Sequence, residues 1–530
     1  MKKLMLVLAV LVLAAGLLSA GPGTETSTTA AGTPKARTLG GLKLPLSATL
    51  ATLRIASGDN WYTPKSYTTG LAVFAEIERQ TNVKIKWEPT PQAQWNDVVN
   101  TLFAAGQDMP DIIDGNFNVT QYFNAGLVLD LKPLIEANAP NIKRQLAERG
   151  LVTALITNPA GNIPRLPFVY VERDMAQTWL VRQDWLDKVG LKVPTTIAEV
   201  EAVLRAFATK DPNGNGKADE IPLGFTDVWG PFYVIPHSFG AHAANDFYPD
   251  KNGKIQYVPT VPEYKEYVAW MAKVYAEKLL DQDFITGNYE QFMAKVANNV
   301  LGMTVGFMQN AQNWNASNTG QKWAAFLPPD GPGGRKAFSE ARTAIGGNCV
   351  ITKDCKDPVL AIKWLDYYWG SEEGIRYTNW GIAGTSYTLV GGKPVFTDFV
   401  LKNPEGLSVI DALRSLGAMP SVAFIVDPTA TTLVGVSDEL KKLNEANKKI
   451  MTNPFPHYDL LHTPAEDEVF NKYWTDINTY QNEWLFNAIA GKTPVSGFDA
   501  YVQKLKDIGL TKVLEVEQGI YERFNSYQKK

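Results

Sequence analysis

Hydrophobic and polar residues follow two periodicities along this chain, one typical of strands and one typical of helices. After about residue 50 the two periodicities alternate. Residues 51–57 form a short apolar run typical of a buried strand, and residues 71–82 carry apolar positions three and four apart, as in a helix. Residues 83–89 alternate as a second strand, before a helical pattern over 95–105 and a short strand over 109–114. Such alternation is typical of a parallel sheet with crossover helices, so the pattern predicts an α/β unit.

A second series of the same kind begins near residue 165. Residues 167–171 predict a strand, and a helix is expected to begin at Thr196, because Glu199 stands three residues later as in a capping box. Further along, Asp357 is expected to cap a helix with Pro358 in its first turn, and the chain after Ser437 is largely helical in pattern. Two α/β units are therefore expected, without detectable sequence repetition between them.

Length and charge narrow the class of protein. At 530 residues the chain exceeds the size of a single core and predicts two or three domains. The net charge is −4 and no long basic run occurs, which argues against a nucleic-acid partner. The 14 tryptophans and 21 tyrosines give a high aromatic content, so flat rings are available for ligand contact.

The N-terminus indicates export. Residues 1–20 combine Lys2 and Lys3 with an apolar core and predict a signal peptide. The leader resembles that of a bacterial lipoprotein, but Gly21 stands where the acylated Cys would be, so release to the periplasm or cell surface is expected and the native lipidation state stays open. Residues 21–49, rich in Gly, Thr, Ala and Pro, are expected to form a disordered linker.

Two cysteines, Cys349 and Cys355, lie close together in the sequence. In an exported protein they are compatible with a local disulfide or with two buried thiols, and the spacing does not decide between these. Neither has the surroundings of a catalytic nucleophile.

The segment DPNGNGKADEIP (211–222) predicts a structural calcium site. Oxygen-bearing side chains stand at places one, three, five and nine of a calcium loop, and Gly216 stands at place six, where a sharp turn is needed. Place twelve is Pro222 instead of the usual Glu, so Glu220 is the nearest carboxylate for that role. The expected ligands are Asp211, Asn213, Asn215, Lys217 through its carbonyl, Asp219 and Glu220. The alternative is an Asn-Gly turn with no metal.

Four segments together resemble one family. They are DWLDKVGLKVPTT (184–196), the DPNGNGKADEIP loop, GIAGTSYT (381–388) and FDAYVQKLKDIGLTKVLEVEQGIYERF (498–524). In this order the chain resembles the extracellular solute-binding proteins of bacterial ABC sugar importers, and within them the alginate- and oligosaccharide-binding group. Ala383 stands where relatives often carry an acidic residue, so the resemblance does not transfer a particular sugar.

The resemblance implies a periplasmic-binding-protein-like fold, with two α/β lobes joined by a hinge and a ligand cleft between them. It implies an oligosaccharide ligand, ABC transporter permease subunits as partners, a monomer, and a calcium ion within one lobe. The protein is then expected to contact the membrane only through the permease or a lipid anchor. The lobes are expected to comprise residues 50–165 with 336–400, and residues 166–335 with 401–530.

Ligand contacts are expected at the carboxyl ends of strands, where open α/β sheets bind their ligands. A sugar presents apolar C–H faces ringed by hydroxyls, so aromatic rings and fixed polar groups are the side chains sought. On this ground the candidates are Asn60, Trp61, Asn116, Trp229 and Trp314. Tyr170 and Tyr387 are added because they lie close to the expected crossings between the lobes, and Arg342 because its charge could pair with an acidic sugar. For each aromatic the alternative is packing in the core, and for Arg342 an ordinary surface position.

Two other functions compete with sugar binding. A glycoside hydrolase needs two carboxylates across the sugar bond, which sequence alone does not place. The chain has no GxSxG, HExxH or GxxxxGK[ST] motif, and its four histidines (His237, His242, His457 and His462) show no metal-ligand spacing. A binder of peptide, polyamine or metal is the third alternative. No catalytic residue is predicted.

Overall fold

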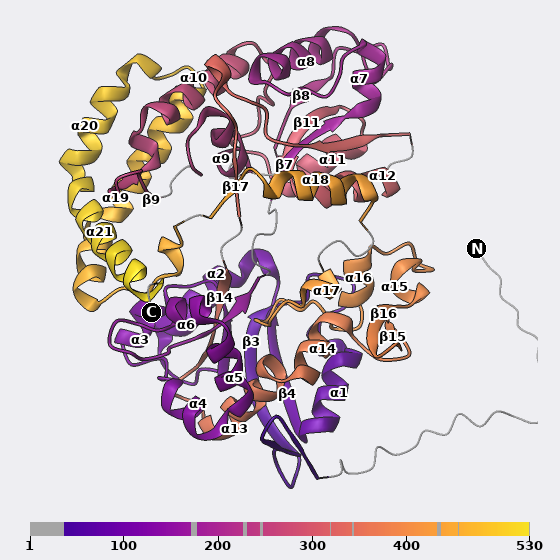
Figure 1. Ribbon diagram of the computed structural model, residues 1–530, viewed down its shortest axis with the longest axis vertical. Helices are drawn as coiled ribbons and strands as arrows, with labels where there is room; N and C mark the ends of the chain where they lie inside the picture. The colour runs from indigo at the N-terminus through magenta and orange to yellow at the C-terminus, as the bar shows by residue number, and fades with distance from the viewer. Residues whose placement is uncertain are drawn as a thin grey trace, which may run out of the picture.

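The molecule, described here by a computed structural model, consists of two lobes that lie one above the other in Figure 1. The structure describes residues 36–170, 177–225, 230–243, 247–317, 320–341, 344–431, 436–453 and 455–528. The lower lobe in the figure, here the N-terminal lobe, contains residues 36–170 and 344–431. The upper, C-terminal lobe contains residues 177–341 and most of the chain after 436. Each lobe has a sheet with helices around it, so the predicted pair of α/β lobes is confirmed.

The N-terminal lobe is built on a five-stranded sheet of order β4-β3-β5-β14-β6. Its strands are β3 (Ala51–Gly58), β4 (Val83–Thr90), β5 (Ile112–Gly115), β6 (Leu166–Val169) and β14 (Ile345–Ile351). β3 is parallel to β4 and β5, as predicted, whereas β14 enters from the other lobe and pairs antiparallel with both β5 and β6. The carboxyl ends of β3, β5 and β6 therefore share one edge with the start of β14.

Helices surround this sheet and hold the strand ends in place. Those of the N-terminal lobe are α1 (Ala72–Thr81), α2 (Gln92–Ala105), α3 (Val119–Asn124), α4 (Lys132–Asn138), α5 (Pro140–Glu148), α6 (Gly150–Ile156), α13 (Pro358–Leu365), α14 (Glu372–Trp380), α15 (Asp398–Leu401), α16 (Val409–Arg414) and α17 (Pro428–Thr431). The predicted cap of α13 is confirmed, since Asp357 accepts a hydrogen bond from the backbone N–H of Leu360 at 2.9 Å. A small hairpin, β15 (Tyr387–Val390) with β16 (Lys393–Phe396), lies on the outside.

The C-terminal lobe has a four-stranded sheet of order β12-β7-β11-β8. Its strands are β7 (Thr178–Arg182), β8 (Ile221–Leu223), β11 (Leu301–Gly306) and β12 (Trp323–Phe326). β11 is parallel to β8 and antiparallel to β7, so the sheet is mixed rather than purely parallel. A Cβ at Gly302 would lie 2.5 Å from Phe207, which shows how closely helix and sheet approach here.

Long helices complete the C-terminal lobe. They are α7 (Gln183–Val189), α8 (Ile197–Thr209), α9 (Gly230–Val234), α10 (Pro262–Ala276), α11 (Tyr289–Ala297), α12 (Met308–Ser317), α18 (Asp438–Lys448), α19 (Pro464–Ile489), α20 (Phe498–Ile508) and α21 (Leu510–Gln528). The capping box predicted for α8 is present, with both Thr196 and Glu199 bonded to the backbone. The last helix, α21, runs down to the N-terminal lobe, where it contacts α6 (Figure 1).

The lobe boundaries differ from the expected ones in one stretch. Residues 401–425 were assigned to the C-terminal lobe, but they pack on the N-terminal one. The N–H of Val73 donates to the carbonyl of Leu416 at 2.9 Å, and Ile425 bridges to Val169 beside the sheet. A Cβ at Gly417 would lie 2.9 Å from Leu71. Residues 401–425 therefore belong to the N-terminal lobe. The sequence pattern did not predict this, because contacts between distant parts of the chain do not affect local periodicity.

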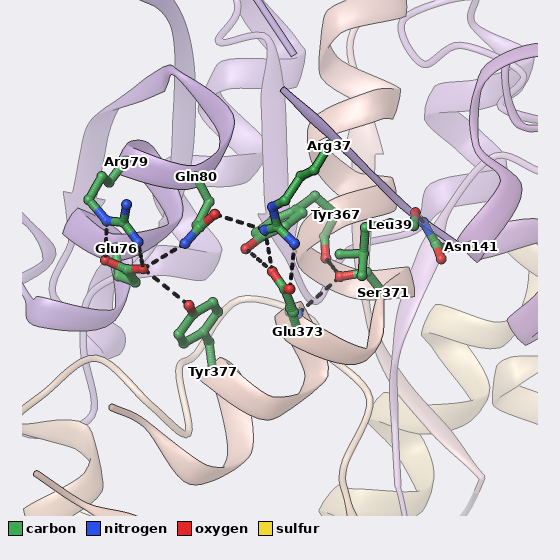
Figure 2. Close-up of polar contacts among 11 residues, drawn as sticks. Arg37, Leu39, Glu76, Arg79, Gln80, Asn141, Tyr367, Ser371, Glu373 and Tyr377 are labelled. Atoms are coloured by element: carbon green, nitrogen blue, oxygen red, sulfur yellow. Dashed lines mark hydrogen bonds and ion pairs between the residues drawn. The ribbon is translucent and has the colours of Figure 1, made fainter. Parts of the chain in front are cut away.

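The start of the chain is also more ordered than the linker expected over 21–49. β1 (Arg37–Leu39) and β2 (Leu42–Leu44) form a hairpin whose apolar positions Leu42 and Leu44 are buried. Figure 2 shows the Arg37 guanidinium between α1 and α14, where it donates to both carboxylate oxygens of Glu373 at 2.6 Å and to Gln80 at 2.8 Å. The linker prediction is therefore wrong from Arg37 onward. Residues 21–35 and the signal peptide lie outside the described residues.

The two cysteines are free thiols, so the disulfide alternative is wrong. Both are buried, and burial raises the pKa of each thiol, to about 12 for Cys355. A thiol with a raised pKa is a poor nucleophile, in agreement with the expectation that neither cysteine is catalytic.

Candidate functional site

A cavity of about 600 Å³ lies where the two lobes meet, and both lobes contribute to its wall. The N-terminal lobe supplies the loop after β5, the end of β6 and the start of β14. The C-terminal side supplies residues 457–462, the first turns of α19 and one residue of α21. We call it the interlobe cavity. Its position at the carboxyl edge of the larger sheet is where open α/β sheets bind small ligands.

The wall from the N-terminal lobe combines amides with aromatic rings. Asn116 is exposed at the end of β5, and Phe117 next to it packs against Phe103 with ring centroids 4.9 Å apart. Tyr170 follows β6 and leans against Phe168 at 4.6 Å. A Cβ at Gly346 would lie 2.7 Å from the Tyr170 hydroxyl, so only a glycine leaves the ring in this position.

The wall from the C-terminal lobe is aromatic and acidic. Phe470 and Trp474, one turn apart on α19, pack with their rings tilted and centroids 4.9 Å apart. His457 is buried and its Nδ1 lies 3.6 Å from Oε1 of Glu517 on α21. His462 Nδ1 lies 3.1 Å from a carboxylate oxygen of Asp467. Rings for the apolar faces of a sugar and polar groups for its hydroxyls therefore line the same cavity.

Arg165 ties the two walls together. Its buried guanidinium donates to Asn348 Oδ1 at 2.7 Å, to the carbonyl of Leu155 at 3.1 Å and to the carbonyl of Asp459 at 2.6 Å. The last bond reaches the segment that runs between the lobes. Breaking it would leave buried donors unpaired, so this edge of the cavity is held firmly.

The predicted ligand residues fall into four groups. Asn116 and Tyr170 are brought together in the interlobe cavity. Trp61 is half exposed at the carboxyl end of β3, on the same edge of the sheet, while the buried Asn60 donates to the carbonyls of Lys65 and Arg414 and fixes its loop. Trp229 and Arg342 lie outside the described residues.

Trp314 and Tyr387 lie away from the interlobe cavity. Trp314 was expected in a loop but sits on α12, where it is 6 % exposed and packs edge-on against Trp323 at 4.9 Å. Its ring is therefore in the core, because α12 begins directly after β11 and turns it inward. Tyr387 is buried on β15 and lines a separate cavity beside Arg37 and Glu373.

The candidates did not include the part of the cavity wall that α19 forms. Phe470 and Trp474 line the interlobe cavity, together with Phe117, which follows Asn116 in the predicted loop. Away from this cavity, Phe307 at the end of β11 and Tyr233 on α9 are 41 % and 50 % exposed. Phe307 could have been predicted from its position at the carboxyl end of a strand, which it follows immediately. The residues on α19 were not, because their helical spacing is that of ordinary packing.

The predicted calcium loop folds around its acidic residues. The Asp211 carboxylate accepts hydrogen bonds from the N–H groups of Gly214 and Gly216, both at 3.0 Å, and Asp219 accepts from the amides of Asn213 and Asn215. All these side chains converge on the centre of the turn. Gly214 and Gly216 have φ of +74° and +75°, which explains glycine at both places.

The surroundings of Glu220 indicate whether a cation fits this loop. Its buried Oε1 has no hydrogen-bond partner among the described residues. Burial raises the pKa of its carboxyl, and the negative charges of Asp211 and Asp219 raise it further. A divalent cation with oxygen ligands would relieve both effects, so the donor set fits calcium. Within the same described part of the chain, no group of three or more His, Cys, Asp or Glu residues is arranged to hold a metal, so amides and carbonyls would have to complete the site.

Two of the histidines have a role outside the cavity. Glu340, in the strand that leads from the C-terminal to the N-terminal lobe, pairs with His237 Nε2 at 3.1 Å and with His242 Nδ1. Burial alone would raise the pKa of the Glu340 carboxyl, but the contacts with both histidines outweigh it and hold that pKa well below its usual range. These histidines therefore brace the crossing segment.

The fold and the interlobe cavity define a two-lobed binding protein for a solute. The chain belongs to the bacterial extracellular solute-binding protein family, whose model matches residues 61–374, more than half of its length. It is 26 % identical over 518 residues to the fructooligosaccharide ABC transporter substrate-binding protein FusA of Streptococcus pneumoniae serotype 4 (strain ATCC BAA-334 / TIGR4), covering 92 % of this chain and 93 % of that protein.

Two solved structures share the fold along nearly the whole chain. The alginate-binding protein AlgQ2, solved without calcium ion, has a TM-score of 0.78 at 27 % identity, covering 90 % of this chain and 99 % of that one. The EF-hand mutant of S. pneumoniae FusA in complex with fructo-nystose has a TM-score of 0.74 at 22 % identity, with the same coverage. In the part of this chain that the structure describes, no helix has the length and apolar character to cross a membrane.

Proposed function

We propose that this protein captures an oligosaccharide between its two lobes and delivers it unaltered to the permease of an ABC transporter. The observation that carries the proposal is the interlobe cavity, in which aromatic rings and amides from both lobes face the same space. Because each lobe supplies part of the wall, a ligand favours the closed arrangement of the lobes. FusA and AlgQ2, which are similar along nearly the whole chain, are a fructooligosaccharide-binding and an alginate-binding protein.

The size of the cavity sets the scale of the ligand. A space of about 600 Å³ falls in the range of sites that enclose small molecules. For sugar units beyond it we propose Trp61, half exposed at the carboxyl end of β3, as a further contact. Two or three stacked rings together with hydrogen bonds give roughly micromolar affinity, about −8 kcal/mol. Such binding is strong enough for capture and weak enough for release to a permease.

The proposed location of the protein agrees with its family of extracellular solute-binding proteins. Export through the predicted signal peptide places it in the periplasm or at the cell surface, where the permease receives the sugar. We propose that it acts as a monomer, since one chain contains both walls of the cavity. A lipid anchor on the native N-terminus would change only the tether and not the site.

We also propose that the loop from Asp211 to Glu220 holds a structural calcium ion. Asp211, Asn213, Asn215, Asp219 and Glu220 would bind through side-chain oxygens and Lys217 through its carbonyl. When bound, the ion neutralises the clustered carboxylates and stiffens the turn, without a part in ligand binding. Support comes from the buried, unpaired Oε1 of Glu220 and from the raised pKa of its carboxyl.

The proposal is tested by tryptophan fluorescence titration against a panel of neutral and acidic oligosaccharides, with product analysis on the same samples. We expect a saturable signal with at least one oligosaccharide and an unchanged sugar after incubation. New reducing ends would identify a glycoside hydrolase, and saturation by peptides alone would identify a binder of another solute.

A further inference from the structure

The charges that line the interlobe cavity are unbalanced. Among its described lining residues there is one arginine, Arg165, against three carboxylates, Asp459, Asp467 and Glu517. The carboxylates all come from the C-terminal side of the cavity, whereas Arg165 comes from the N-terminal lobe. A charged ligand that enters this space would therefore meet a mainly acidic wall.

The single arginine is not available to a ligand. Its two terminal nitrogens donate to Asn348 and to the carbonyls of Leu155 and Asp459, all inside the protein. Its Nε is buried as well, and the whole residue is 5 % exposed. The guanidinium therefore supports the wall, and no fork of free N–H donors is presented to a carboxylate in the cavity.

Two of the three carboxylates, Glu517 and Asp467, make few polar contacts with the described residues. Glu517 is fully buried in the cavity wall, and neither of its oxygens has a hydrogen-bond partner among the residues described. The nearest histidine nitrogen to it, Nδ1 of His457, lies 3.6 Å away. Asp467 contacts His462 through one oxygen at 3.1 Å. Each imidazole of the cavity thus already stands beside a carboxylate of the protein.

We propose that the interlobe cavity takes uncharged sugar units and excludes acidic ones such as uronates. The inference rests on the proposed function and names the substrate class of the same site. A uronate carboxylate would lie near like charges in a partly dehydrated space, where repulsion is strong. Among the described lining residues, no cation is free to offset it. Sugar hydroxyls donate to carboxylates in charge-assisted hydrogen bonds, and the amides of Asn116 and Asn118 complement them.

The experiment compares matched neutral and acidic probes on the full-length mature protein. Fructo-, gluco- and galacto-oligosaccharides are titrated beside oligogalacturonates and oligomannuronates of equal length, at about pH 8, where imidazoles are in general neutral. The expected result is that the best neutral oligosaccharide binds at least about tenfold more tightly than any uronate. Equal or tighter binding of a uronate overturns the inference but leaves the proposed function standing. Absence of binding by every sugar overturns both.

Charge-removing variants show whether the cavity carboxylates cause the selectivity. Glu517→Gln and the double variant Asp459→Asn/Asp467→Asn keep the shape of each side chain. Each is expected to reduce the neutral-to-uronate ratio by about threefold or more. Asp476→Asn, an exposed site further along α19, makes the same change outside the cavity and should leave the ratio unaltered. Melting curves identify any variant that fails to fold. An unchanged ratio in both folded cavity variants contradicts the inference.

Discussion

Tyr170 passes so close to Gly346 that a Cβ at Gly346 would lie 2.7 Å from the tyrosine hydroxyl and 2.9 Å from the ring. The end of β6 and the start of β14 thus fix one aromatic wall of the interlobe cavity. Gly346 is not among the glycines with positive φ, so an alanine there strains the ring position rather than the backbone.

Gly346→Ala is therefore expected to push Tyr170 into the cavity and to weaken oligosaccharide binding by about tenfold, roughly 1.4 kcal/mol. Fluorescence titration measures the effect. Gly150→Ala is the control, because no atom lies within 4 Å of a Cβ there. Equal affinities of Gly346→Ala and the parent protein would remove Tyr170 from the site.

Trp61 and Trp314 are expected to behave in opposite ways. Trp61 is half exposed at the carboxyl end of β3, so Trp61→Ala should weaken sugar binding by about tenfold while the melting temperature stays constant. Trp314 is buried against Trp323, so Trp314→Ala should lower the free energy of unfolding by about 3–5 kcal/mol. Titration and thermal melting of both variants decide the matter. A stable Trp314→Ala that fails to bind sugar would return that residue to the ligand site.

The calcium loop predicts a dependence of stability on divalent ions. An ion that binds only the folded state stabilises it, so EDTA should lower the melting temperature and added calcium should restore it. Asp211→Ala should abolish this response, whereas Asp97→Ala, an exposed carboxylate on α2, should keep it. If the parent protein melts identically with and without chelator, the loop is a plain turn.

Asp114 predicts a dependence of stability on pH. Burial raises the pKa of its carboxyl to about 7, although the N–H of Ala423 and the thiol of Cys349 donate to it and act in the opposite direction. Because the folded state holds this proton more tightly, the contribution is complete below the ordinary pKa of Asp, about 3.9, and is lost as the pH rises to about 7. At about 1.4 kcal/mol per pH unit, the loss is at most about 4 kcal/mol.

Asp114→Asn should remove this contribution and flatten the stability profile between about pH 4 and pH 7. Urea unfolding across that range measures it, and Asp97→Asn serves as the control for an exposed carboxylate. A profile as steep in Asp114→Asn as in the parent would mean that Asp114 ionises normally in the folded protein.

Local sequence patterns predicted much of this fold, because many of its helices and strands depend on interactions between residues close in sequence. The strand–helix alternation, the Thr196 capping box and the Asp357 cap each depend on neighbours within a few residues. The antiparallel entry of β14 and the packing of residues 401–425 on the N-terminal lobe depend on contacts between distant parts of the chain. Periodicity carries no information about such contacts, so these features were missed.

The residues of the binding site likewise differ in how far the sequence predicts them. Asn116 was predictable because it follows a strand at the carboxyl edge of the sheet, and Tyr170 because it lies close to the crossing between the lobes. Trp314 was misplaced because its polar neighbours are the exposed face of a helix and not a loop. The cavity face of α19 was missed because a helix that lines a cavity has the same apolar spacing as one that lines a core.

Hydrogen–deuterium exchange, measured with and without a saturating oligosaccharide, tests capture between the lobes most directly. The account predicts slower exchange on both sides of the interlobe cavity at once, over residues 115–120 and 345–348 of the N-terminal lobe and over residues 457–474 beyond the crossing. Protection confined to one lobe, or located away from this cavity, would contradict it.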